Sequence, residues 1–487
     1  MKTALAILIM LQLASAISLH AEPKPNILYL LTDQWRGMAT GYAGDPNVKT
    51  PNLDRLAKEG LNFSNAVSVC PVCTPHRAAL MTGRFPTSTG MFLNDAYLPS
   101  EELCMAEILQ EAGYNRGFIG KWHIDGHGRE SFIPPERRQG FDYWKGNECT
   151  HTYNRSPYYS GDDPEKRYWD GYDAFAQTKD AQSYIKAQAG SGKPFALVIA
   201  FGPPHFPHAT APDEYKKLYP PDQLKLAPSV PESQQAAARK ELQGYYAHCS
   251  ALDQCIGDLL ATLDETGVAE NTIVVFSADH GETMGSRGNR PAQKQVPWVE
   301  AACVPFLLRY PAGQGAEGVK VKTPLTTPDI LPTLLGLAGV PIPASIEGDD
   351  LSAAVRDPVH AGDRVALYEG ISLFANLGPE GKGNDRNYRA IRTSRYTYVR
   401  DLKGPWLLYD DETDPFQMNN LVGKPEASEL QKDLDAKLQA ELNKRGDEFR
   451  DGQYYIDLWG YNARAGSSIS YRFNAAVQSP KKRTSAK

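Results

Sequence analysis

The residue of this chain that is most suited to take part in a reaction is a cysteine at the expected start of a helix. From Cys73 to Gly83 the sequence reads CTPHRAALMTG. Proline is favoured at the first position of a helix and glycine just beyond its end, so we predict a helix that starts at Pro75 and stops at Gly83, with Cys73 just before it. Free backbone N–H groups and the positive end of the helix dipole meet at such a start and attract anions. The segment therefore predicts an anionic ligand beside the thiol.

A second interpretation of the same segment is a redox-active or metal-binding pair, because Cys70 and Cys73 have CxxC spacing. The sequence has seven cysteines and no second pair at this spacing, so it lacks the thiolates for a four-cysteine zinc site. If Cys73 is chemically modified, six cysteines remain, and these can pair in an oxidising compartment or stay free in the core. The cysteines are residues 70, 73, 104, 149, 249, 255 and 303.

Four strongly apolar segments indicate which elements position this cysteine. Such segments are typical of strands that are buried on both faces of a sheet. Helical patterns lie between them, and this alternation predicts the α/β class, with a large, mostly parallel sheet sandwiched by helices. Ligands of such sheets bind beyond the carboxyl ends of the strands. The expected strands are residues 26–31, 117–119, 195–201 and 272–276, and the expected helices include residues 52–59, 103–112 and 236–266.

Polar residues follow each of these strands and are candidates for a site. Taken singly, an aspartate after a strand can be a helix cap, and a loop lysine or histidine can simply be solvated. Together with an arginine four residues after the cysteine, they predict a metal-assisted site for a tetrahedral oxyanion. The candidates are Asp33, Gln34, Arg77, Lys121, His123, His205, Asp279, His280 and Lys294.

The segment CTPHR at residues 73–77 resembles the signature of the formylglycine-dependent sulfatases, which belong to the alkaline phosphatase superfamily. In this family the cysteine is oxidised after translation to an aldehyde. His76 stands where the family usually has serine, whereas the cysteine, proline and arginine are retained. The resemblance extends from Pro25 to Pro311, including GFDY at residues 140–143, and continues into the C-terminal part at residues 388–421. Nearly the whole mature chain is thus similar to a sulfatase.

The resemblance implies a metal centre. Its ligands would be Asp33, Gln34, Asp279 and His280, completed by an oxygen of the modified Cys73. Calcium is the usual ion of the family. Gln34 and His280 stand where many members have aspartate and asparagine, and the nitrogen donor leaves room for manganese.

The resemblance also implies a nucleophile, formylglycine (3-oxoalanine), which a maturation enzyme makes from Cys73. A hydrated aldehyde offers two hydroxyls on one carbon: one attacks sulfur, and the other, once deprotonated, expels sulfate and regenerates the aldehyde. By resemblance, Asp279 is the base for the first hydroxyl and His123 for the second, while His205 and Lys294 assist the departing alcohol. The implied catalytic residues are Cys73, Arg77, Lys121, His123, His205 and Lys294.

Substrate specificity is expected from the segment between His127 and Tyr172, which is polar and rich in aromatic residues and arginines. Aromatic faces beside arginines suit sugar rings that carry anionic groups, although such a segment can also pack against itself. We expect His151, Arg155 and Trp169 to bind the substrate, a sulfated polysaccharide or oligosaccharide. The alternatives are a phosphonate or phosphodiester hydrolase of the same superfamily and a non-catalytic binder of sulfated glycans.

Composition and the chain start predict an exported protein. Its 487 residues, 41% apolar, allow a large core, and the net charge of −6 does not favour nucleic acid as a partner. The apolar run at residues 4–14 is shorter than the roughly 20 residues of a membrane anchor and precedes small residues, as in a cleaved signal peptide. We therefore predict a periplasmic or secreted protein without a membrane anchor. Its parts would be a signal peptide (1–21), a catalytic domain (22–360), a C-terminal α+β subdomain with an antiparallel sheet (361–465) and a tail (466–487).

Overall fold

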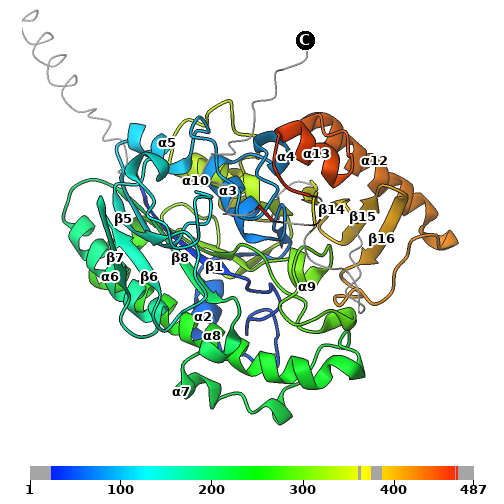
Figure 1. Cartoon of the computed structure of the whole chain (residues 1–487), viewed down its shortest axis with the longest axis horizontal. Helices are drawn as coiled ribbons and strands as arrows, with labels where there is room; N and C mark the ends of the chain where they lie inside the picture. The colour runs from blue at the N-terminus through cyan, green and yellow to red at the C-terminus, as the bar shows by residue number, and fades with distance from the viewer. Residues whose placement is uncertain (1–23, 360–363, 374–385, 465, 467, 470–487) are drawn as a thin grey trace, which may run out of the picture.

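A sheet of ten strands forms the centre of the molecule (Figure 1). The computed structural model describes residues 24–359, 364–373, 386–464, 466 and 468–469, so the predicted signal peptide and most of the predicted tail lie outside the described residues. In spatial order the strands are β11 (Val319–Val321), β2 (Leu61–Phe63), β10 (Phe306–Arg309), β9 (Thr272–Ala278), β1 (Asn26–Asp33), β8 (Phe195–Pro204), β4 (Asn115–Lys121), β5 (Tyr143–Asn147), β6 (Pro157–Ser160) and β7 (Asp163–Tyr168).

Parallel pairs dominate the centre of this sheet. Strands β9, β1, β8 and β4 are neighbours that run in one direction, and Leu28 of β1 pairs with Leu197 on one side and Val274 on the other. Antiparallel pairs lie toward the edges, where β10 pairs with β9 and β2, and β6 pairs with β5 and β7. The prediction of a large, mostly parallel sheet is confirmed.

Helices cover both faces of the sheet, as predicted (Figure 1). Because both faces are covered, every residue of β8 and β9 is buried, which explains their unbroken apolar runs. One face carries α2 (Pro51–Glu59), α6 (Asp173–Ala189) and α8 (Glu232–Glu265), and the other carries α3 (Cys73–Thr82), α5 (Met105–Glu111) and α10 (Ile330–Leu337).

Helix α3 begins two residues earlier than predicted. Cys73 is its first residue and Val72 its N-cap, so Pro75 is the third helical residue and not the first. Proline is tolerated there because N–H groups of the first turn have no acceptor within the helix. The helix ends at Gly83 as predicted, where φ is 65° and the N–H donates to the carbonyl of Ala79. The thiol is therefore part of the helix start itself.

A second, smaller sheet lies in the C-terminal part and is antiparallel throughout, as predicted. Its strands are β13 (Ala366–Gly370), β14 (Tyr388–Arg392), β15 (Tyr396–Asp401) and β16 (Gly404–Asp410), and α12 (Ser428–Arg445) packs against β14 and β15. This unit shares an apolar cluster with the segment around α3, in which Val69, Val72 and Phe85 meet Leu408 and Leu438. The small sheet thus supports the helix that carries Cys73.

Short elements complete the described chain. All seven cysteines are buried and unpaired, so neither the CxxC disulfide nor pairing among the other six is observed. Among the described residues, no helix has the length and apolar character needed to cross a membrane. The short elements are β3 (Ala66–Val67), β12 (Leu325–Thr326), α4 (Pro86–Thr89), α7 (Asp213–Lys216), α9 (Val299–Ala302), α11 (Ser352–Arg356), α13 (Gly452–Trp459) and the 3₁₀ turns η1 (Pro135–Arg137), η2 (His208–Thr210), η3 (Pro221–Gln223), η4 (Ala269–Asn271), η5 (Ser286–Gly288), η6 (Thr327–Asp329) and η7 (Pro425–Ala427).

Candidate active site

The polar residues predicted to form a site converge at one edge of the large sheet. Asp33 is the last residue of β1 and Lys121 the last of β4, while Asp279 follows β9 and His205 follows β8. Because these four strands are parallel neighbours, their carboxyl ends meet at the same edge. Helix α3 starts at this edge, which brings Cys73 to the same point.

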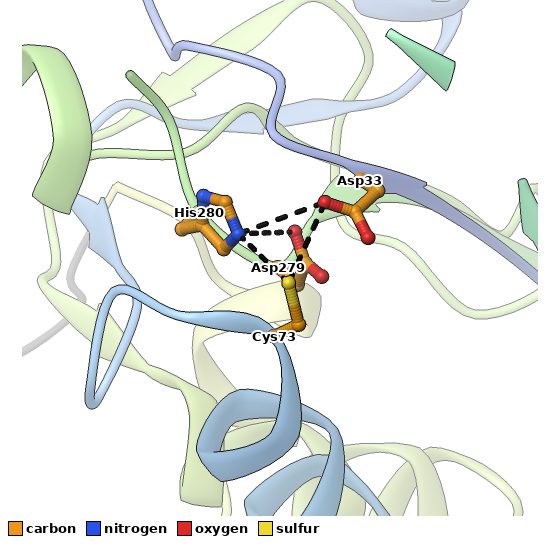
Figure 2. Close-up of side chains that lie close together, drawn as sticks. All are labelled: Asp33, Cys73, Asp279 and His280. Atoms are coloured by element: carbon orange, nitrogen blue, oxygen red, sulfur yellow. Dashed lines mark hydrogen bonds and ion pairs between the residues drawn. The ribbon is translucent and has the colours of Figure 1, made fainter. Parts of the chain in front are cut away.

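Four of these side chains form a compact cluster (Figure 2). One ligand-type atom from each of Asp33, Cys73, Asp279 and His280 lies within 4.8 Å of the others. The Cys73 Sγ is 3.3 Å from His280 Nε2, which in turn is 3.6 Å from an Oδ1 of each aspartate. His280 Nδ1 donates to the carbonyl of Gly281 at 2.8 Å, so the Nε2 lone pair faces the cluster.

Buried cations hold the outer oxygen of each carboxylate. Arg77 donates from Nε and Nη2 to Asp279 Oδ2 at 3.2 and 3.0 Å, and from Nη2 to Asp33 Oδ2 at 3.2 Å. Lys121 Nζ donates to the same oxygen of Asp33 at 2.5 Å. Burial alone would raise the pKa of Asp33, but the positive charge of Lys121 and its neighbours holds it below its ordinary value. The Oδ1 atoms of Asp33 and Asp279 therefore face the cluster.

Gln34 and Lys294 border the cluster near the sulfur. Lys294 Nζ lies 3.4 Å from Cys73 Sγ, 3.3 Å from Gln34 Oε1 and 2.9 Å from His205 Nε2. Burial and the charge of Lys294 lower the pKa of His205 to about 4, so its ring is neutral near pH 7 and accepts from the lysine. Gln34 has a φ of 68°, a left-handed conformation that is uncommon outside glycine and tends to occur at functional sites.

His123 lies beside the first turn of α3, where Thr74 Oγ1 donates to its carbonyl at 2.9 Å. Its ring is oriented by Asp95, whose Oδ1 is 2.7 Å from His123 Nε2. The Nδ1 atom has no hydrogen-bond partner among the described residues. Both His123 and Asp95 have positive φ values, 60° and 64°. The imidazole is therefore held in a fixed orientation by Asp95, and the His123 side chain also interacts with that of Cys73.

The three residues predicted to bind substrate lie in different surroundings. His151 stacks on His205 with ring centroids 4.7 Å apart, and so borders the candidate site. Arg155 is exposed, and its guanidinium lies 4.5 Å from the ring centre of a neighbouring tyrosine. Trp169 is only 8% exposed and stacks on Tyr158 at 4.0 Å. For Trp169 these contacts favour the alternative interpretation, in which the segment packs against itself.

Comparison with known proteins agrees with this geometry. The family model described as Sulfatase matches residues 25–340, and one described as N-sulphoglucosamine sulphohydrolase, C-terminal, matches residues 292–444. This chain belongs to the sulfatase family. Sulfatases hydrolyse sulfuric esters, so the protein is an enzyme of that class.

Named relatives of this sulfatase share most of its length. An ulvan-active sulfatase of Formosa agariphila is 56% identical over 441 residues, which cover 90% of this chain and 85% of the relative. An endo-4-O-sulfatase of Bacteroides thetaiotaomicron is 32% identical, with 82% and 88% covered. The crystal structure of a Bacteroides fragilis protein assigned to the sulfatases matches with a TM-score of 0.80 at 30% identity, covering 90% of this chain and 98% of that one.

The cluster of this sulfatase fits a divalent cation. Two carboxylates that are 0% exposed lie together, and Arg77 and Lys121 contact only their outer oxygens. A bound cation would neutralise the negative charge on the inner oxygens of these two carboxylates. The carboxylate oxygens, the amide oxygen of Gln34 and the Nε2 of His280 form a mainly hard donor set. Such a set suits calcium, and its one nitrogen is also compatible with manganese.

Three residues that contact the site were not predicted from the sequence: Asp95, Glu282 and Phe206. Glu282 Oε2 accepts from Gln34 Nε2 at 3.1 Å, and Phe206 stacks on His205 with ring centroids 4.4 Å apart. Glu282 and Phe206 lie within two residues of predicted site residues, and this proximity was the available signal. Asp95 lies in a loop remote from every motif, where no sequence pattern indicates its role.

Proposed function

We propose that this sulfatase is exported and metal-dependent, and that it uses formylglycine formed at Cys73 to hydrolyse sulfate esters of ulvan or a related sulfated polysaccharide, or of its oligosaccharides. The position of Cys73 carries the proposal, because its sulfur lies 3.4 Å from Lys294 Nζ and 3.3 Å from His280 Nε2 at the start of α3. The 56% identity to an ulvan-active sulfatase supports the substrate class.

Two groups would complete this centre. Formylglycine in its hydrated form supplies a nucleophilic hydroxyl and a second hydroxyl for the release of sulfate, and it requires a formylglycine-generating maturation enzyme as a partner. A divalent cation, with calcium preferred over manganese, supplies positive charge that favours the ionised nucleophile. The proposed ligands are Asp33, Gln34, Asp279, His280 and the modified Cys73.

The remaining side chains orient the substrate and transfer protons. Arg77 fixes the two carboxylates, and the ammonium groups of Lys121 and Lys294 offset the charge of the sulfate oxygens. We assign the pair of Lys294 and neutral His205, with nitrogens 2.9 Å apart, to protonation of the departing alcohol oxygen. We assign to His123, which interacts with the side chain of Cys73, the deprotonation of the second hydroxyl of the nucleophile.

Export and domain organisation are part of the proposal. A polysaccharide substrate requires the enzyme to act outside the cytoplasm, which agrees with a signal peptide at residues 1–21 and a periplasmic or secreted location. We place the catalytic domain at residues 22–360, the C-terminal subdomain at 361–465 and the tail at 466–487.

Release of inorganic sulfate tests the function. The enzyme, expressed with a formylglycine-generating enzyme, should release sulfate from ulvan oligosaccharides, and Cys73→Ala should not. Parallel assays with a phosphonate monoester and a phosphodiester test the rival hydrolase, which faster turnover of those esters would favour. Binding of the oligosaccharides without sulfate release, by a protein whose Cys73 is unmodified, would instead indicate a non-catalytic binder.

A further inference from the structure

A cavity of about 740 Å³ is lined by the segments that adjoin His205 and Lys294 in the sequence. Its walls come from residues 206–209, which directly follow His205, from residues 290–293, which directly precede Lys294, and from the first turns of α8. The volume lies within the range of small-molecule sites. Because two walls continue in sequence from His205 and Lys294, which contact each other, a molecule in this cavity would lie next to a substrate bound at Cys73.

One wall of the cavity presents an aromatic face. Phe206 is 37% exposed, and its ring is supported by stacking on His205 at 4.4 Å and by His151 at 5.3 Å. Pro207 and Pro291 add apolar surface. An exposed aromatic ring fixed in this way is suited to packing against the apolar C–H face of a sugar ring.

Another part of the lining carries an uncompensated positive charge. Arg290 is exposed, and its guanidinium makes no ion pair with any residue that the structure describes. Its backbone carbonyl accepts from Thr283 Oγ1 at 2.9 Å and from Gln293 N at 3.2 Å, which fixes the turn. The acidic residue in the lining, Glu241, is paired with His208 Nδ1 at 2.8 Å. The cavity therefore favours an anionic occupant.

We propose that this cavity is a subsite for an acidic sugar residue that neighbours the sulfated sugar in the substrate. Phe206 would stack on the ring, and the planar guanidinium of Arg290 would bind its acid group through paired hydrogen bonds. The inference rests on the proposed carbohydrate sulfatase function and adds to it. Recognition of two adjacent sugars makes the enzyme selective for oligosaccharides over sulfated monosaccharides.

The test compares a sulfated monosaccharide with a disaccharide in which the same sugar is linked to a uronic acid. In Phe206→Ala and Arg290→Ala, the ratio of kcat/KM for the disaccharide to that for the monosaccharide should fall about tenfold, mainly through KM, as expected for loss of a charged hydrogen bond or an aromatic contact. Phe206→Tyr keeps the ring and should keep the ratio. Arg55→Ala on α2, an exposed arginine outside the cavity lining, is the matched control.

A binding measurement separates this inference from the proposed function. In the Cys73→Ala background, calorimetry should show that the disaccharide binds more tightly than the monosaccharide, and that Arg290→Ala removes the difference. Equal affinity for the two sugars, or an unchanged ratio in both variants, would overturn the subsite. Absence of sulfate release by the wild-type enzyme would contradict the proposed function, while the binding result would still decide the subsite.

Discussion

Two cysteines three residues apart show how the surroundings of a residue determine its chemistry. Cys70 and Cys73 are each 1% exposed. Burial raises the pKa of the Cys70 thiol, which packs in the apolar cluster shared with the small sheet. Burial acts on Cys73 in the same direction, but Lys121, Lys294 and His280 lower its pKa well below the ordinary value. Only Cys73 therefore lies in an electropositive site suited to an anion.

This difference predicts opposite results for two alanine variants. Cys73→Ala should lower kcat by more than about a thousandfold, because it removes the nucleophile. Cys70→Ala should keep most of the activity and lose some stability, because it leaves only a small cavity. Peptide mass spectrometry of active wild-type enzyme should show formylglycine at position 73. Full activity from a sample with wholly unmodified Cys73, or loss of activity only in Cys70→Ala, would support the redox alternative.

Glu282 acts on the metal centre through Gln34. The Nε2 of Gln34 donates to Glu282 Oε2 at 3.1 Å and to the carbonyl of Ala292 at 3.4 Å, so its Oε1 points to the side of Lys294 and the cluster. Glu282→Met removes this acceptor at similar volume and lets the amide rotate. We expect calcium affinity, measured by calorimetry with the metal alone, to fall about 10- to 100-fold, as for other partners of metal ligands.

A conservative variant and a matched control define this effect. Glu282→Gln keeps an acceptor oxygen and should retain more of the affinity than Glu282→Met. Glu300 is equally buried, but it accepts from Ser229 and Arg287 and does not touch Gln34. Glu300→Met should therefore lower stability and leave calcium affinity unchanged. Equal losses of affinity in the two methionine variants would contradict a positioning role for Glu282.

The candidate site was predictable where its residues directly follow apolar strands. Asp279 and His205 do so and Asp33 ends its strand, and the parallel order of the strands brings the three together. Asp95 was not predictable, because its contact with His123 depends on a loop conformation with positive φ that no sequence pattern indicates. The aromatic composition that suggested a binding role for Trp169 could not distinguish an exposed ring from a buried one.

At the scale of elements, the buried strands and long helices were predicted because their apolar patterns are continuous. The predicted strand at residues 272–276 is β9, which continues for two further residues. The predicted helix at 236–266 is α8, which starts four residues earlier and ends one residue earlier. The start of α3 was misplaced, because Pro75 is compatible with several positions of the first turn. The antiparallel pairing of β10 depends on long-range contacts that local patterns do not contain.

Helix α6 begins with a buried carboxyl group that makes no ion pair with a described residue, and this predicts a pH dependence. Asp173 is 1% exposed, its Oδ1 has no hydrogen-bond partner among the described residues, and burial raises its pKa to about 7. In the unfolded chain the pKa of aspartate is about 3.9. The folded state thus retains a proton that the unfolded state loses. The contribution of Asp173 to the stability of the folded state is therefore complete below about pH 4 and is lost as the pH rises through 7.

Asp173→Asn should remove this titration. At pH 8 the variant should be more stable than the wild type, by on the order of 4 kcal/mol for a shift of this size, and the difference should shrink toward pH 4. Urea unfolding at several pH values, followed by tryptophan fluorescence, measures it. Asp170→Asn, at a nearby exposed position, is the control. A stability difference that is independent of pH would show that ionisation of Asp173 is not its cause.

At the scale of the whole molecule, the small sheet shares an apolar cluster with the segments around α3, and we expect these two units to unfold together. Val72 and Phe85, on either side of α3, pack in this cluster with Ile391 of the small sheet and with Leu438 of α12. Arg287 adds a polar connection, because it donates to the carbonyls of residues 416 and 417. Since α3 carries Cys73, loss of the small sheet would leave the nucleophile without support on one side.

Leu438→Ala tests this coupling, because the side chain is 0% exposed within the shared cluster. The cavity should cost about 2–5 kcal/mol. If the two units unfold as one, calorimetry of the variant should show a single transition at a lower Tm, and catalytic activity should be lost over the same temperature range. Leu402→Ala, at a position that is 50% exposed, should leave Tm nearly unchanged. Two transitions, with only the first displaced and activity retained beyond it, would show instead that the C-terminal unit unfolds independently and does not support the active site.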